Sequence, residues 1–310
     1  HIGELHSSDR SLLLDYVWPR INRARGTSSN QPINQQTLFD ALSRSLENLG
    51  NAGSLSDLEG ALSAVNYTAA EQRTAKQSRL LARAKKSYNL YLRERNQRED
   101  LAGLAPRDAL VDVRVKNGEL ISTVTLPTSV LRAGAGWQTV GEELEFAGGG
   151  GLWINQGSRA LRGKPGHLAR SQHSRLDLDL KFPTGDPRWY IVEFDGITLM
   201  IVIAANNSVQ VELMDGPALD EKKARQAFEK ALHGQFAPPI AYVIPEGLHR
   251  LTIDVVPTSA QTQANVIVKL ENKELMRRLC KCDTKRAPDF VVHPMQELKV
   301  MRASVQVWVQ

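Results

Sequence analysis

Two carboxylates, Glu193 and Asp195, are separated by a single residue at the end of the apolar segment Trp189–Asp195. The segment is rich in aromatic and β-branched residues, as strands are, and side chains two positions apart on a strand point to one face. Paired carboxylates about 5–5.5 Å apart are what retaining cleavage of a glycosidic bond requires. A simpler interpretation places Asp195 in a hairpin turn with Gly196, because Asp before Gly favours turns, and leaves Glu193 on an exposed sheet face.

A second group of reactive residues surrounds Cys280 and Cys282, the two cysteines of the chain. A closed zinc site takes four ligands, so an isolated Cys-x-Cys predicts no metal site, and a local disulfide or two thiols are expected instead. The cations around this pair are Arg277, Arg278, Lys281, Lys285 and Arg286. Five basic residues within ten could bind an anionic polymer such as sulfated glycan or nucleic acid. A solvated loop is the alternative.

Aromatic side chains on a strand surface would provide a stacking platform for a sugar ring. The candidates are Trp137, Trp153, Trp189 and Trp308. Core packing is the alternative for each of them. The four-glycine turn Gly148–Gly151 lacks the Lys-Ser/Thr of a phosphate-binding loop, and no nucleotide, zinc-protease or serine-hydrolase signature occurs. We therefore expect no cofactor.

The overall composition is that of a globular protein. The chain has 310 residues, 42% of them hydrophobic and 24% charged, as is usual for folded domains. A net charge of +5 does not by itself indicate nucleic acid. No run approaches 18 apolar residues, so no membrane-spanning segment is expected. The chain begins with His1 and not Met, which suggests a removed leader or a longer parent protein. A secreted or periplasmic location is favoured, and the oligomeric state is open.

Residues 1–105 carry helical rather than strand signals. Asn34 is suited to cap a helix whose leucines recur at steps of three and four. Thr68 followed by Glu71 fits a capping box and predicts the start of a long helix over 69–100. That helix holds nine Lys/Arg against four Asp/Glu. A solvated outer face of a helical bundle is the simpler explanation, and a phosphate-binding or acidic-partner surface is the other.

Residues 106–310 read as short strands separated by turns. The segment Arg175–Phe182 alternates strictly between leucine or phenylalanine and charged residues, as a half-buried strand does. Asp195-Gly196 and Asn206-Asn207 favour hairpin turns, which predicts a four-stranded antiparallel meander over 175–213. One helix, expected over 219–232, interrupts the strands. The predicted fold class is α+β: a helical N-terminal region followed by an antiparallel β-sandwich of jelly-roll type with one inserted helix.

The order of these segments resembles that of concanavalin A-like jelly-roll domains. Gly136–Ile154 is similar to their opening strands around a glycine-rich turn, and 175–182 resembles the strand that follows in laminin G-like and 3-keto-disaccharide hydrolase-like members. Gly247–Val255 and Val266–Leu275 resemble their late hairpin, and Ser304–Val309 their terminal strand. The resemblance covers about residues 110–310 and implies a domain boundary near residue 105.

Domains of this class bind glycans, proteins or other ligands, and some hydrolyse glycosides. The retaining β-glucanases among them carry Glu-x-Asp-x-x-Glu, whereas here a turn is expected at Gly196 and the last Glu is replaced by Thr198. We therefore expect a non-enzymatic binding or assembly module that recognises a glycan or protein partner. The alternatives are a glycoside hydrolase of the same fold using Glu193 and Asp195, and a particle subunit that contacts RNA or an acidic partner through basic surfaces.

Overall fold

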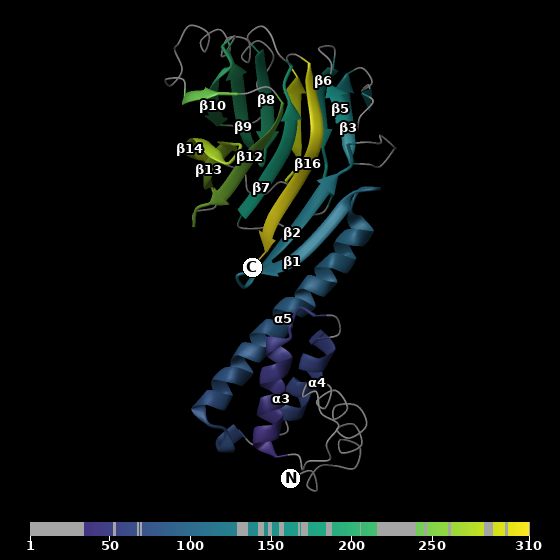
Figure 1. Ribbon diagram of the computed structural model, residues 1–310, viewed down its shortest axis with the longest axis vertical. Coiled ribbons are helices and arrows are strands. Elements are labelled where there is room, and N and C mark those ends of the chain that lie inside the picture. The colour runs from purple at the N-terminus through teal and green to yellow at the C-terminus, as the bar shows by residue number, and fades with distance from the viewer. Residues whose placement is uncertain are drawn as a thin grey trace. The chain divides into compact units, whose positions relative to one another are not determined.

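The structure, a computed structural model, describes 17 stretches of the chain. They are residues 34–51, 54–66, 68, 70–128, 136–141, 146–147, 151–154, 158–166, 168, 173–183, 188–204, 206–215, 240–244, 247–259, 262–281, 288–294 and 297–309. The chain divides into two compact units, residues 1–96 and residues 97–310 (Figure 1). The division falls within the longest helix. The helix expected over 219–232 lies outside the described residues.

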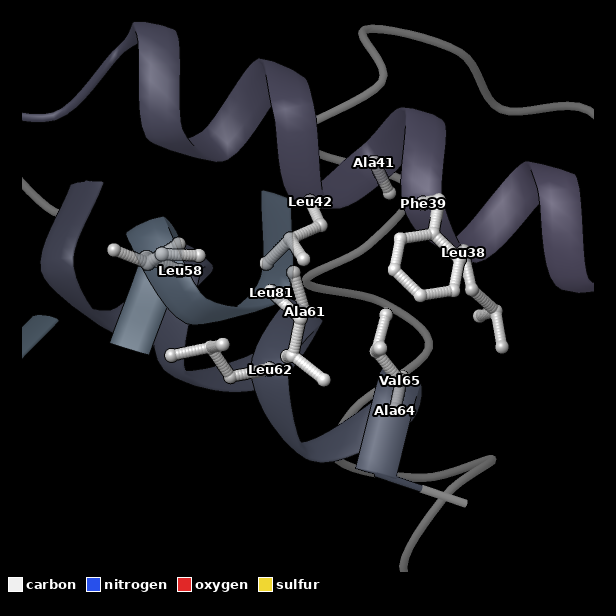
Figure 2. Packing of buried hydrophobic residues seen from close by; sticks show 11 residues of the cluster. Leu38, Phe39, Ala41, Leu42, Leu58, Ala61, Leu62, Ala64, Val65 and Leu81 are labelled. Atoms are coloured by element: carbon white, nitrogen blue, oxygen red, sulfur yellow. The ribbon is translucent and has the colours of Figure 1, made fainter. Parts of the chain in front are cut away.

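The described part of the first unit is helical. Its elements are α3 (Gln35–Glu47), α4 (Ser54–Asn66), the short 3-10 helix η3 (Ala70–Gln72) and the first part of α5 (Ala75–Leu104). Apolar residues of α3, α4 and α5 meet in one small core (Figure 2). The buried members are Leu38, Phe39, Ala41, Leu42, Leu58, Ala61, Leu62, Ala64, Val65, Leu81 and Ala84. Burying each leucine side chain here stabilises the unit by roughly 2 kcal/mol.

Two helix starts show where local sequence signals succeed and fail. The capping role expected of Asn34 is confirmed, because its side-chain oxygen accepts a hydrogen bond from the Thr37 N–H at 2.8 Å. The long helix, however, begins later than Thr68. Its capping box is formed by Thr74 and Gln77, whose side chains each accept the other's backbone N–H, at 3.2 and 2.9 Å. The Thr68 hydroxyl instead donates to the Val65 carbonyl. Between Thr68 and the start of α5, the described residues form only the short helix η3.

The second unit contains the last turns of α5 and two antiparallel sheets. Arg98 in α5 donates to the Val113 carbonyl at 2.6 Å, and Leu101 is buried. Among the described residues, one sheet has nine strands: β1 (Leu110–Lys116), β2 (Glu119–Leu126), β16 (Leu298–Val309), β7 (His173–Lys181), β12 (Leu248–Pro257), β13 (Gln263–Leu270) and β14 (Lys273–Lys281) in that spatial order, with β5 (Gly151–Ile154) beside β16 and β4 (Phe146–Ala147) beside β5. This sheet holds both ends of the expected sandwich segment.

The other sheet has seven strands within the described part of the chain. In spatial order they are β11 (Ile240–Val243), β10 (Ser208–Asp215), β9 (Ile197–Ile203), β8 (Arg188–Phe194), β15 (Phe290–Pro294), β6 (Ser158–Gly163) and β3 (Trp137–Gly141). Figure 1 shows the two sheets as the layers of a sandwich. The expected fold, helices followed by an antiparallel β-sandwich, is confirmed.

The meander predicted over 175–213 is correct for three strands and wrong for the first. Strands β8, β9 and β10 pair consecutively, but β7 belongs to the nine-stranded sheet, where it lies between β16 and β12. Alternation in β7 correctly predicted one buried face. It could not predict the partners, because those strands lie some 70 and 130 residues later in the chain. A strand buried on one face fits either sheet of a sandwich equally well.

Side chains from both sheets fill the space between the layers. Leu176 and Leu178 of β7 and Tyr190, Val192 and Phe194 of β8 are at most 1% exposed. The phenol of Tyr190 donates to the Glu297 carbonyl at 3.3 Å, and its burial raises the pKa of the phenol.

Four hairpins among the described residues use left-handed turn residues, and in the one between β9 and β10 the residue is Asn207, with a φ of 60°. Asn117-Gly118, between β1 and β2, has φ angles of 54° and 80°, and Asp195-Gly196, between β8 and β9, has 50° and 79°. Asn-Gly and Asp-Gly adopt the primed turns that match strand twist, and the turn at Asp195-Gly196 was predicted from the sequence. A further turn, between β13 and β14, lies at Glu271-Asn272, with φ angles of 49° and 66°.

Candidate functional site

The seven-stranded sheet has a second face, which carries apolar and polar side chains together. Along β8, Tyr190 and Phe194 point into the core, so the alternation of a strand turns Trp189, Ile191 and Glu193 to the opposite side. We call this side the outer face. Trp189 and Glu193 are half-buried, whereas Ile191 is buried.

An apolar floor lies at the centre of the outer face. Val202 of β9 is paired with Trp189, and Met200 is paired with Ile191. Ile191, Met200 and Val202 are at most 3% exposed, and every residue of β9 is buried. Strand β9 is therefore covered on both faces. The polar groups of the outer face have these buried apolar side chains as neighbours.

The principal polar pair is formed by Glu193 of β8 and His293 of β15. Strand register places Glu193 beside Val291 and His293 beside Ile191, so the two side chains meet diagonally across neighbouring strands. The His293 Nε2 atom hydrogen-bonds the Glu193 Oε1 atom. Each side chain is about one-fifth exposed. Within the described residues, Glu193 Oε2 and His293 Nδ1 have no protein partner, so both can meet an incoming hydroxyl group.

A buried amide lies in the same area. Gln210 of β10 is paired with Val202, which is paired in turn with Trp189. The Gln210 Oε1 atom is buried and has no hydrogen-bond donor among the described residues. Buried side-chain oxygens in native proteins nearly always have a partner. Gln210 is half-buried and lies in the same row of paired residues as Val202 and Trp189.

The predicted pairing of Glu193 with Asp195 is not formed. The strand ends at Phe194, and the left-handed φ of Asp195 (50°) turns its side chain out of the strand alternation. The Asp195 carboxylate accepts the Ser174 hydroxyl of β7, in the other sheet, at 2.6 Å. The two carboxyl groups thus have partners in different sheets. The turn, which was the alternative interpretation of Asp195, is what the structure contains.

The tryptophans predicted as ligand-binding residues occupy different surroundings. Trp137 donates its indole N–H to the Pro127 carbonyl at 2.6 Å. Trp308 lies on the nine-stranded sheet, where the His173 ring stacks on it with centroids 3.8 Å apart. Trp153 lies in β5, and its side chain lies outside the described part. Trp189 remains as the indole that shares the outer face with Glu193.

The predicted basic cluster lies on β14, an edge strand of the nine-stranded sheet. Arg277 forms an exposed ion pair with Glu274 at 2.8 Å, and Arg278 donates to the Leu213 carbonyl at 2.8 Å. Lys281 is exposed and Cys280 is buried. The other two cations of the predicted cluster, Lys285 and Arg286, lie outside the described residues, as does Cys282. The described part of this cluster therefore lies on an edge strand of the nine-stranded sheet, whereas Glu193 and His293 lie on the seven-stranded sheet.

A charged network that the sequence analysis did not single out lies on the nine-stranded sheet. Asp254 of β12 accepts two hydrogen bonds from Arg175 at 2.6 and 3.1 Å and one contact from His173 at 3.1 Å. Lys269 lies 3.7 Å away. Burial raises the pKa of Asp254, but the hydrogen bonds and charges of His173 and Arg175 outweigh this effect and lower the pKa to about 2. Alternation along single strands gave no signal for the network, because its members come from three strands.

Searches of the described part find neither a metal cluster nor a membrane helix. No group of three or more His, Cys, Asp or Glu side chains there could hold a metal ion. No helix in that part is long and apolar enough to cross a membrane.

No family model and no curated protein matches the chain. Solved structures do. The endo-1,3-beta-glucanase from Streptomyces sioyaensis is 11% identical, with 59% of this chain and 92% of the glucanase covered at a TM-score of 0.38. Peanut lectin is 8% identical, with 61% of this chain and 99% of the lectin covered at a TM-score of 0.34. A Caenorhabditis elegans galectin is 10% identical, with 49% of this chain and 94% of the galectin covered at a TM-score of 0.30. All three TM-scores lie below 0.5.

Proposed function

We propose that the sandwich is a carbohydrate-binding module and that its ligand lies on the outer face of the seven-stranded sheet. The observation that carries this proposal is the half-buried Glu193–His293 pair, which shares the outer face with the half-buried Trp189. An apolar surface with a few convergent polar groups is the usual composition of small-molecule sites.

The chemistry of a sugar ring fits this arrangement. Its C–H groups would lie against Trp189, and its hydroxyls would reach the remaining atoms of the polar pair. A hydroxyl can donate to the Glu193 carboxylate or the Gln210 oxygen and can also accept from the imidazole of His293. The buried oxygen of Gln210, which lacks a donor among the described residues, would gain one. Hydrogen bonds to a charged group contribute about 1.5–3 kcal/mol, so Glu193 should be the strongest polar contact.

A glycan-array screen of the whole chain, at low and near-physiological salt, tests the proposal. We expect neutral glycans to bind at both salt concentrations, because stacking and hydrogen bonding are screened little by salt. For a glycan identified in this way, Trp189→Ala and Glu193→Gln should each weaken binding about tenfold or more. The matched control is Trp308→Ala, which removes a half-buried indole from the other sheet and should leave the affinity unchanged.

Two outcomes would contradict the proposal. One is an array without any bound neutral glycan. The other is loss of affinity in Trp308→Ala with full affinity in Trp189→Ala, which would place the ligand on the nine-stranded sheet. Release of reducing ends from a bound glycan, abolished by Glu193→Gln, would instead support a glycoside hydrolase. The separation of Glu193 from Asp195 does not favour that activity.

A further inference from the structure

The first 19 residues of α5, 75–93, contain six Lys or Arg residues and no Asp or Glu. An exposed helix face usually mixes charges of both signs, since pairs of opposite charge three or four residues apart stabilise the helix. This segment has no such pair, because it has no acidic residue. The segment therefore lacks this stabilisation and carries positive charges only.

Five of the six cations lie on one side of the helix, and Lys85 lies outside that arc. At 100° per residue, Lys76, Arg79, Arg83, Lys86 and Arg93 fall within an arc of about 100°, and all five are exposed. The buried Leu81 and Ala84 lie on the opposite side. We call these five residues the basic face of α5. From the first to the last, the row is about 26 Å long, because each residue adds about 1.5 Å.

Four of these cations have no counter-ion among the residues that the structure describes. Within the described residues, Lys76, Arg79, Arg83 and Lys86 form neither an ion pair nor a hydrogen bond through their side chains. Arginines on the sandwich differ, because Arg250 pairs with Asp179 at 2.7 Å. An extended row of exposed cations, with no acidic residue in the helix between residues 75 and 93, creates a positive potential that attracts a polyanion.

We propose that the basic face of α5 binds the phosphate backbone of nucleic acid without reading base sequence. Lys and Arg clustered along one side of a helix are the usual electrostatic footprint of such binding. The aromatic residues of the segment, Tyr88 and Tyr91, are half-buried on the core side of the helix, so they offer bases no stacking platform. A membrane surface is a poorer partner, because Leu81 and Ala84 are already buried in the helical core.

The test is fluorescence anisotropy of the whole chain with a labelled 20-base-pair DNA duplex, titrated at several salt concentrations. Five phosphate contacts predict a slope of about −4.5 when the logarithm of the association constant is plotted against the logarithm of the salt concentration. This slope corresponds to a decrease in affinity of about 500-fold between 50 and 200 mM salt. The double variant Arg79→Ser/Arg83→Ser removes two contacts. The slope for this variant should be shallower, about −2.7, and its affinity should decrease only about 40-fold between 50 and 200 mM salt.

The chain offers a matched control in the exposed cations of β14. Arg277→Ser/Lys281→Ser removes the same net charge and should leave the slope unchanged. An unchanged slope in the α5 variant, or a reduced slope only in the β14 variant, would overturn the proposal. So would tighter binding to heparin, a sulfated polysaccharide, or to poly-glutamate than to the duplex. Glu193→Gln should not affect duplex binding, so this result and the glycan result can fail separately.

Discussion

The network around Asp254 leads to a quantitative prediction about acid stability. The Asp254 carboxyl is 3% exposed and has a pKa of about 2 in the folded chain, against a usual value of 3.8. Its charged form is therefore stabilised by folding. This lowered pKa corresponds to a contribution of about 2 kcal/mol to the free energy of unfolding.

The sign of the effect sets the pH range in which it appears. Because the folded pKa is lowered, the contribution is fully present above pH 3.8 and is lost as the pH falls through about 2. Between these values the carboxyl should remove about 1.4 kcal/mol of unfolding free energy for each pH unit. Asp254→Asn removes the titrating group, so the wild-type curve should fall toward the curve of the variant by about 2 kcal/mol between pH 5 and pH 2.

Urea unfolding followed by tryptophan fluorescence at several pH values measures this difference. The signal reports mainly on the sandwich, because four of the five tryptophans lie in residues 97–310. Asp112→Asn is the control, since the Asp112 side chain is 59% exposed and 3.8 Å from Arg114, and such surface pairs contribute at most about 1 kcal/mol. Parallel pH curves for wild type and Asp254→Asn would refute the reasoning.

Three further predictions concern packing and capping. Gly163→Ala should destabilise the sandwich by about 2 kcal/mol or more, because an added Cβ would lie 2.1 Å from the buried ring of Phe290; thermal unfolding measures this, and an unchanged midpoint would contradict the tight contact. Leu42→Ala should cost the helical unit about 2–5 kcal/mol, since Leu42 is fully buried, and loss of helical circular dichroism at lower temperature would show it. Asn34→Ala should cost about 1 kcal/mol through loss of the Thr37 hydrogen bond, whereas Asn34→Asp should retain stability in the same melt.

Much of the local structure could be predicted from short patterns. Asn34 caps its helix and Asp195-Gly196 forms a left-handed turn, because the interactions involved span only a few residues. The alternation of β7 identified its buried face for the same reason. The long helix was predicted to start too early, because the signals at Thr68 and Thr74 are similar and only the folded chain selects between them.

The candidate site was predicted only in part. The sequence indicated Glu193 and Trp189, but it gave Glu193 the wrong partner, because Asp195 is adjacent in the chain while His293 is 100 residues away. Gln210 was not singled out, because an unsatisfied oxygen is a property of its surroundings.

By itself, the sequence determined a helical region followed by antiparallel strands, the faces that those strands bury and the turns that join neighbouring ones, since these depend on residues close together in the chain. Only the tertiary structure decided that β7 joins the sheet of β12 and β16, that Asp195 reaches Ser174, and that His293 meets Glu193. The physical reason is the same in each case. Strand order and side-chain partners across a sandwich depend on contacts between distant segments, which no local period encodes.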